Sequence, residues 1–398
     1  MRIITTEKVP IKMWLEEIEE GAIEQAKNLA NLPFIFKHVA IMPDSHIGFG
    51  MPIGGVIACK NVVIPAAVGV DIGCGVGFLE TNIPVEALRD ISTPNGELLN
   101  AIISNIRRNV PVGFNKHKEP QNSPIFNSTP VYPIIQDELE NAMYSLGTLG
   151  GGNHFIELQK NAAGNLCIML HSGSRNFGLK IANHFDEQAK ELNAKYHSTV
   201  DAKVGLAFLP VDSKEGQAYI ECMNYALLFA QENRAVMMRR IKNIVFNMVQ
   251  RYTDFKNVEV LSEVNIHHNY AALENHYGHN VWVHRKGATS AQEGQLGLIP
   301  GSQGTNSYVV MGKGNSESFK SCSHGAGRKM GRKQAQRELN LDAEKKILDD
   351  QGIIHGITSM SDLDEAAGAY KNIDVVMKNQ EDLVSIVMKL SPIAVIKG

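Results

Sequence analysis

The clearest pattern in the chain is a long run of apolar residues at helical spacing in residues 217–253. Apolar side chains recur every three or four positions, as at Ile220, Leu227, Met237 and Met248. This spacing places them on one face of an α-helix, so the segment predicts a long amphipathic helix. Weaker helical patterns cover residues 15–31 and part of residues 81–109.

Short apolar runs that stop at polar residues predict buried strands. Residues 166–170 end at His171, residues 258–261 lead toward His267 and His268, and residues 393–396 end at Lys397. Functional sites often lie at strand ends and in the loops of a rigid sheet. The strands and helices do not alternate regularly, which favours an α+β fold over a repeating βαβ fold. We expect one integrated domain over residues 1–398, with central mixed sheets flanked by helices.

Residues 110–132 interrupt these patterns with four prolines and many polar side chains, and they predict a long loop. Loops of this length inside compact proteins are often functional or mobile.

Composition narrows the class of protein. The chain has 398 residues, of which 43% are hydrophobic and 20% charged, as in ordinary soluble proteins. Its net charge is -3, so a nucleic acid would have to bind a local basic surface. Five cysteines without a CxxC pair argue against a disulfide framework or a zinc ribbon. With no signal-like or membrane-spanning segment expected, these features predict a cytoplasmic protein.

His324 is the most informative residue, because glycines and cations follow it directly. The sequence continues Gly325-Ala326-Gly327-Arg328 and carries more basic residues beyond. The segment from Arg328 onward predicts a helix, which would place the glycines at its N-terminus, where free N–H groups suit a phosphate. A histidine at a phosphate site can act as a nucleophile or as a ligand.

Two glycine-rich segments suggest metal and anion chemistry. Asp71 and Cys74 combine a hard and a soft ligand, which suits borderline divalent metals. A plain glycine turn with a buried cysteine is the alternative. Downstream of a glycine run, His154 is a ligand candidate, Asn153 a phosphate contact, and Glu157 could accept hydrogen bonds from a guanine edge. The alternative there is a glycine loop with a capping Asn153.

Further candidates lie at strand ends and in polar loops. His171 is a possible ligand, and Arg175 is suited to a phosphate or carboxylate. Because side chains alternate along a strand, only one of two adjacent histidines can face a given centre. We choose His268 as the ligand and expect a supporting role for His267. We also expect supporting roles for Asp44 and His46. The polar segment 300–307 could bind a nucleobase or ribose.

Taken together, these segments resemble the RtcB family of RNA-splicing ligases, which join RNA 3′-phosphate and 5′-hydroxyl ends. Each segment alone is weak, but nine occur in the order found in the family. They are Met42-Pro43-Asp44, residues 70–75, residues 150–157, residues 171–175, His268-Asn269, residues 285–288, Pro300-Gly301-Ser302, residues 324–328 and residues 395–398.

The resemblance implies two Mn²⁺ ions bridged by Cys74. Asp71 and His154 would complete one ion's protein ligands, and His171 and His268 the other's. The residue types alone would suit zinc equally well. The resemblance also makes His324 the nucleophile that GTP guanylylates. It implies that the nucleotide contacts Asn153, His154, Phe155, Ile156, Glu157, His268, Asn269, Pro300, Gly301, Ser302, Gln303, Ser307, His324, Gly325, Ala326, Gly327 and Lys397.

The implied reaction passes guanylate from His324 to an RNA 3′-phosphate, and a 5′-hydroxyl end then attacks the RNA–ppG end and releases GMP. A 2′,3′-cyclic phosphate would first be opened. We expect RNA phosphates to pair with Arg175, Arg285, Lys286 and Arg328. The partner is RNA with these ends, the protein is expected to be a monomer, and an accessory protein is possible.

The chain departs from familiar members at Ser45, at Phe49, where some of them carry a basic residue, and in the loop 110–132. These differences leave the choice of RNA ends open, including a paralogue specialised for repair of a particular RNA or for 3′-phosphate capping. Two other classes remain as alternatives, a metallophosphoesterase or nuclease and a non-catalytic RNA-binding protein.

Overall fold

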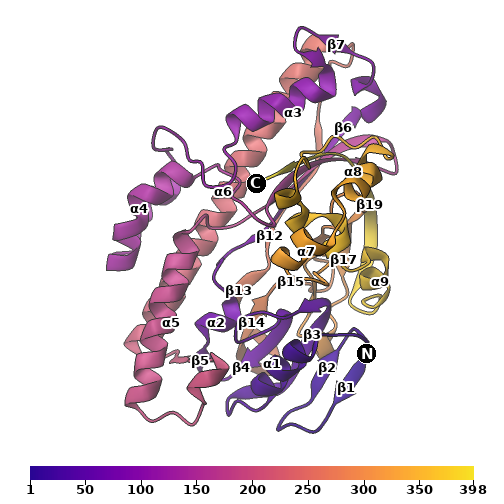
Figure 1. Cartoon of the computed structure of the whole chain (residues 1–398). Coiled ribbons are helices and arrows are strands. Elements are labelled where there is room, and N and C mark those ends of the chain that lie inside the picture. The colour runs from indigo at the N-terminus through magenta and orange to yellow at the C-terminus, as the bar shows by residue number, and fades with distance from the viewer.

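A computed structural model describes all residues 1–398 and contains two large β-sheets (Figure 1). Neighbouring strands are antiparallel except for the parallel pair β2 and β3. The six-stranded sheet runs in the order β1 (Arg2–Ile4), β2 (Ile11–Met13), β3 (Ile35–His46), β4 (Ile53–Cys59), β14 (His279–Lys286) and β13 (Asn269–His276). The seven-stranded sheet runs β12 (Val260–His267), β6 (Gly75–Pro84), β10 (Asn165–Ser172), β9 (Phe155–Asn161), β19 (Val384–Lys397), β17 (Ser307–Gly312) and β16 (Leu296–Ile299).

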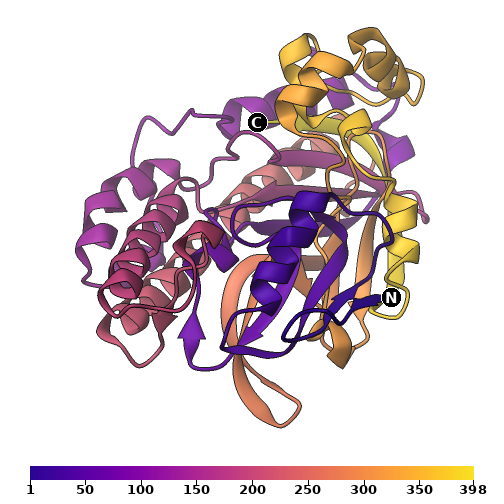
Figure 2. The ribbon, with the colours of Figure 1, turned by 60° about the horizontal axis from the view of Figure 1, so that its bottom comes forward.

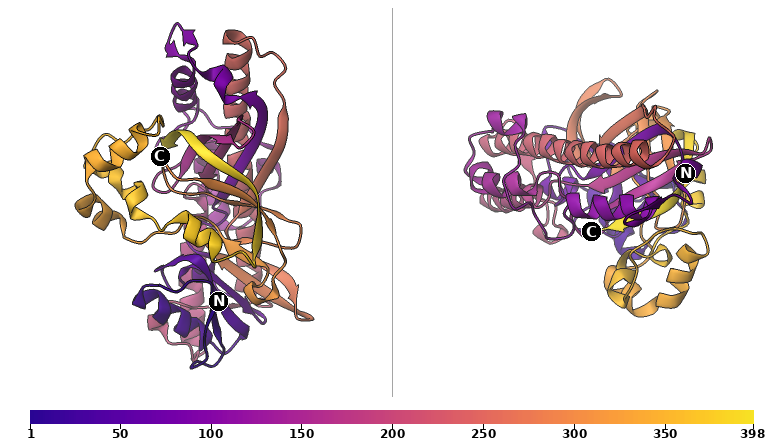
Figure 3. Two further views of the ribbon diagram at one scale, coloured as in Figure 1. Left: turned by 90° about the vertical axis from the view of Figure 1, so that its right-hand side faces the viewer. Right: turned by 90° about the horizontal axis from the view of Figure 1, so that it is seen from above.

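The predicted long helix is confirmed as α6 (Lys214–Tyr252), which begins where the Ser213 side chain accepts a hydrogen bond from the Gly216 N–H. Its apolar face packs against β6, β10 and β12 and against α3 (Leu98–Asn109) and α5 (Phe177–Lys195). Figure 3 shows α6 on one side of the sheet and the C-terminal helices on the other. Figure 2 shows α4 (Pro133–Ser145) and α5 lying beside each other at one end of the molecule.

Other elements also agree with the sequence patterns. The segment 15–31 contains α1 (Glu20–Ala30), and 81–109 ends in α3. The run 166–170 lies inside β10 and 393–396 inside β19, whereas the strand expected near 258–261 begins at Val260 and continues to His267. The loop 110–132 contains only the short turn η2 (Pro124–Ser128). Helices and sheets that do not alternate confirm the α+β class.

The prediction that a helix begins at Arg328 is wrong. Gly327 has a positive φ of 72°, and Arg328 forms an isolated bridge with Tyr370. The chain is therefore not helical until α7, which begins at Arg332 and runs to Glu338. The glycines after His324 therefore do not lie at a helix N-terminus.

Smaller elements complete the chain, and no helix in it is both long and apolar enough to cross a membrane. The segment after α7 adds α8 (Leu341–Asp349), the 3-10 turns η5 (Met360–Glu365) and η6 (Ala367–Ala369), and α9 (Ile373–Lys378). The others are β5 (Val62–Val63), α2 (Pro65–Val68), η1 (Val85–Leu88), β7 (Ser92–Thr93), β8 (Gly96–Glu97), η3 (Ala202–Val204), β11 (Leu209–Pro210), β15 (Ala288–Ser290), η4 (Ser316–Ser318) and β18 (Ser321–Ser323).

Candidate active site

The candidate site lies where the chain passes from one large sheet to the other. His268 separates β12 of the seven-stranded sheet from β13 of the six-stranded sheet, and its N–H donates to the Cys74 carbonyl at 2.9 Å. Cys74 directly precedes β6, and His171 lies near the end of β10. His154 directly precedes β9. The ends of three neighbouring strands thus bring together residues far apart in the sequence.

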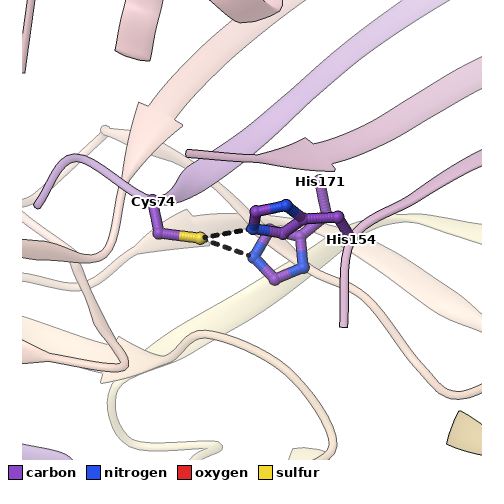
Figure 4. Close-up of side chains that lie close together, drawn as sticks. All are labelled: Cys74, His154 and His171. Atoms are coloured by element: carbon purple, nitrogen blue, oxygen red, sulfur yellow. Dashed lines mark hydrogen bonds between the residues drawn. The ribbon is translucent and has the colours of Figure 1, made fainter. Parts of the chain in front are cut away.

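Side-chain donor atoms converge at this seam (Figure 4). The Cys74 Sγ lies 3.2 Å from the His171 Nε2 and 3.5 Å from the His154 Nε2. The His171 Nε2 also lies 3.3 Å from the His268 Nε2, and the Asp71 Oδ2 lies 3.3 Å from the His154 Nε2. Cys74, His154 and His171 together have the spacing of a metal site. The structure therefore brings all five predicted ligands together.

The protonation of these groups favours cation binding. The His171 Nδ1 lies 3.2 Å from the Asn153 carbonyl, to which it can only donate, so its Nε2 presents a lone pair to the cluster. Burial lowers the pKa of His171 and of His268 well below the usual range, which keeps both rings neutral. Burial, with the charge of Asp71, raises the pKa of the Cys74 thiol. A thiolate there needs a cation beside it, so the donor set fits a divalent metal.

The backbone around the cluster is held by Arg234, which sequence reasoning missed. This buried guanidinium donates to the carbonyls of Gly73 and Ser172, at 2.8 and 2.9 Å. It also lies 3.0 Å from the Nδ1 of His267. His267 thus points away from the cluster while His268 points into it. No local motif marks Arg234, because it is one of many polar residues along α6.

His324 lies beside this cluster, in the segment that follows β18. Its Nδ1 is 2.6 Å from the Asp44 Oδ2, and its backbone N–H donates to the same oxygen at 3.0 Å. Its ring centroid is 4.7 Å from that of His268. Asp44 is fully buried, and although burial opposes ionisation, the nearby His324 lowers the pKa of the carboxyl below its usual value. The Nδ1 of His324 is thereby engaged, and its Nε2 remains for other chemistry.

A cavity of about 270 Å³ opens beside His324 and carries most of the predicted nucleotide contacts. Phe155 and Glu157 face it from one side of β9, whereas the side chain of Ile156 lies in the hydrophobic core, as strand alternation requires. The predicted residues that line the cavity are Asn153, Phe155, Glu157, His171, Pro300, Gly301, Ser302, Gln303, His324, Gly325, Ala326, Gly327, Arg328 and Lys397.

Among the other predicted contacts, His154 and His268 belong to the donor cluster and do not line the cavity, and Ser307 and Asn269 shape the walls of the site. The Ser307 Oγ accepts a hydrogen bond from the Gly301 N–H at 3.1 Å and so fixes the polar loop. The Asn269 side chain accepts from the Gly287 N–H at 2.7 Å and donates to the Asp71 carbonyl at 3.1 Å. Both residues fix backbone at the site.

Sequence comparison with known proteins identifies the family of this chain. The family model described as tRNA-splicing ligase RtcB matches residues 25–132 and 130–398. The chain belongs to the RtcB family. It is 37% identical over 413 residues to the RNA-splicing ligase RtcB of Escherichia coli K12, covering 100% of this chain and 99% of that protein. The tRNA-splicing ligases RtcB of Thermococcus kodakarensis and Archaeoglobus fulgidus are 30% and 32% identical, each covering 96% of this chain and 92% of theirs.

Charge in this RtcB cavity is organised by Glu365, which carries no sequence signal. Its buried carboxylate lies 3.0 Å from Arg328 and from Arg332 and 3.7 Å from Lys397, and it accepts a hydrogen bond from Tyr370. Three cations from separate segments therefore share one anion at the edge of the cavity. Only their contact in three dimensions could have identified Glu365.

Two of the four cations expected to bind RNA phosphates have other partners. Arg285 is fully buried, and its guanidinium lies 2.5 Å from the Glu274 carboxylate, so the expected RNA contact of Arg285 is wrong. The buried Lys286 ammonium donates to the carbonyls of Phe49 and Ala66, at 2.6 and 3.1 Å, so that expectation is wrong too. Both lie at the buried end of β14, where an unpaired charge is costly.

Replacing Cys74 with Ala should abolish binding of a divalent metal at the cluster, because it removes the sulfur closest to both His154 and His171. Metal content per chain, measured by mass spectrometry after incubation with Mn²⁺ and desalting, checks this. Cys167→Ala is the matched control, since that thiol is also buried but lies outside the cluster. Wild-type Mn²⁺ content in Cys74→Ala would refute the ligand assignment.

Proposed function

We propose that this protein is a GTP- and Mn²⁺-dependent RNA ligase. It joins RNA 3′-phosphate or 2′,3′-cyclic phosphate ends to 5′-hydroxyl ends in RNA repair or tRNA splicing. The observation that carries this proposal is His324, held by the buried Asp44 in a nucleotide-sized cavity beside a cluster of metal donors. The names of its relatives, which are RNA- and tRNA-splicing ligases, support the same activity.

His324 acts first, as the nucleophile. Asp44 accepts the Nδ1–H, which orients the ring and leaves the Nε2 lone pair directed away from Asp44. The Nε2 attacks the α-phosphorus of GTP, a P–N bond forms, and the bond to pyrophosphate breaks. Asp44 also stabilises the positive charge that develops on the ring. The product is a guanylylated His324.

Asp71, Cys74, His154, His171 and His268 would hold two Mn²⁺ ions, since their donor atoms lie close together. When bound, such ions offset the negative charge that develops on phosphate oxygens. The preference for manganese over zinc rests on the family, because thiolate, imidazole and carboxylate suit both.

We place the guanine base against Glu157, because its carboxylate can accept hydrogen bonds from the two donors of the guanine edge. Lys397 lies in the same cavity, with its ammonium 5.7 Å from the centre of the Phe155 ring. Phosphates then lie toward His324 and the metal cluster. This arrangement separates the recognition of the base from the reacting phosphorus.

The guanylate next passes to an RNA 3′-phosphate. A 5′-hydroxyl end then attacks the RNA–ppG end, the new phosphodiester forms, and GMP leaves. Arg328 lines the cavity and remains a candidate contact for an RNA phosphate. Arg175 is half-buried and bonded to Gly113 and Thr148, and we keep it as a candidate that also orders the site. A cytoplasmic monomer, with or without an accessory protein, remains our expectation.

His324→Ala should retain Mn²⁺ and lose covalent labelling by GTP, because the attacking nitrogen is gone. Incubation of protein with Mn²⁺ and GTP labelled at the α-phosphate, followed by denaturing gel electrophoresis, measures this. His279→Ala, which removes an exposed histidine at the start of β14, should label normally. Acid-labile label on His324→Ala would mean another nucleophile, and no label on wild type with metal bound would favour a hydrolase.

Asp44→Asn should slow guanylylation by about 100-fold or more, by analogy with carboxylates that fix a catalytic histidine's tautomer. The amide can no longer act as an anion toward the Nδ1–H, so the ring loses its orientation and its charge partner. Initial rates of labelling measure the effect, and metal content serves as the control. A rate within twofold of wild type would show that Asp44 has no part in the reaction.

Guanine binding should strengthen as the pH rises. Burial raises the pKa of Glu157 to about 8, so the free protein holds this carboxyl protonated at neutral pH. Guanine needs the ionised form, so binding releases a proton below that pKa, and affinity rises by up to about tenfold per pH unit before levelling off. Calorimetry of GTP binding to His324→Ala protein measures this. The slope should vanish when Glu157→Gln is added, and a slope that persists would place the titrating group elsewhere.

A further inference from the structure

An exposed basic segment lies at the edge of the site and has no part in the chemistry above. Residues 98–118 contain four Arg or Lys residues and no Asp or Glu, in a chain whose net charge is -3. All four cations are exposed. We call Arg107, Arg108, Phe114, Lys116 and Lys118 the basic rim. Such a local concentration of positive charge is what an acidic chain needs to attract a polyanion.

Phe114 stands out within the basic rim, because its side chain is fully exposed while the backbone around it is fixed. The Gly113 N–H donates to the Gly150 carbonyl at 2.9 Å, and Arg175 donates to the Gly113 carbonyl at 2.8 Å. The Asn115 N–H donates back to Val112 at 3.2 Å, closing a tight turn. The phenyl ring is thus presented to solvent by a segment anchored on both sides.

These anchors connect the basic rim to the metal cluster. Gly150 has a positive φ of 94° and lies so close to His154 that any side chain there would collide with the ring. The turn carrying Phe114 is therefore bonded directly to the backbone that positions His154. Figure 1 shows where this turn lies, between α3 and α4.

A second cavity, of about 480 Å³, extends the site toward the basic rim. Arg107 and Val112 line it, and it shares Gln303, Glu365 and Lys397 with the cavity beside His324. Asp362 and Asp364 also line it and would repel a phosphate, whereas Arg107 would attract one. A polyanion leaving the catalytic cavity therefore has its favourable path on the side of the basic rim.

We propose that the basic rim binds the single-stranded end of an RNA substrate, with a nucleobase stacked on Phe114 and phosphates paired with Lys116 and Lys118. This inference rests on the proposed function. Aromatic rings between cations are typical of single-strand binding, because every base has a flat face. A protein partner would require a broader apolar patch, whereas the neighbours of Phe114 in the turn are Gly113 and Asn115.

The test is the affinity of the full chain for a fluorescent single-stranded RNA with a 3′-phosphate, measured by anisotropy at fixed salt. Phe114→Ala should weaken binding by about tenfold, in keeping with the loss of one stacked base. Phe114→Trp should restore it. Val131→Ala is the matched control, because Val131 is exposed and lies in the same long loop, outside the basic rim. Covalent labelling of His324 by GTP without RNA should be unchanged in all three variants.

Two further measurements separate stacking from charge. An abasic nucleotide, moved one position at a time along the RNA, should remove the effect of Phe114→Ala at one position only. The variant Lys116→Ala with Lys118→Ala should lower the salt dependence of binding by a slope of about 1.4, as expected for two phosphate contacts to a single strand. Lys195→Ala, an exposed lysine at the end of α5, should leave the slope unchanged.

Unchanged RNA affinity in Phe114→Ala would overturn the stacking contact, and an unchanged salt slope in the double lysine variant would overturn the phosphate contacts. If neither property changes while His324 still labels, the basic rim serves a partner other than RNA and the proposal fails. If wild type binds RNA as expected but never labels with GTP, the proposed ligase activity fails while the RNA-binding surface stands.

Discussion

The site depends on the burial of uncharged nitrogen and sulfur donors at the junction of two sheets. His268 is the single residue between β12 and β13. Both sheets therefore fix the direction of its side chain. Burial keeps His171 and His268 neutral and disfavours the Cys74 thiolate until a cation is present. A neutral, preformed donor set binds metal without first losing protons from its histidines, and only the thiol must ionise.

The charged groups of the cavity follow a different rule, because each is paired before any substrate arrives. Asp44 is paired with His324, and Glu365 is shared by Arg328, Arg332 and Lys397. Removing Glu365 would leave Arg328 and Lys397 without their shared anion, and removing Asp44 would leave the Nδ1–H of His324 without its acceptor, both of which are costly in a protein interior. A phosphate that enters the cavity meets cations already held in position, so little side-chain entropy is lost on binding.

The sequence predicted what local spacing determines. Helical periodicity predicted α6, and apolar runs ending in polar residues predicted β10 and the end of β19, with His171 and Lys397 where the structure places them. The sequence-based prediction failed where contacts between residues far apart in the sequence determine the structure. Tyr370 holds Arg328 extended and delays α7, and Glu274 occupies Arg285. Glu365 and Arg234 carry no local signal, because their roles exist only through contacts with residues from other segments.

The same distinction applies to the cations that the sequence places beside the motifs. The two basic residues adjacent in sequence on β14, Arg285 and Lys286, are buried and satisfied within the fold. Exposed cations near the site come from the start of α7, where Arg332 lines the cavity, and from the end of α3 and the loop that follows. A cation beside a motif contributes to recognition only if the fold leaves it in water. The basic rim meets that condition, whereas Arg285 and Lys286 do not.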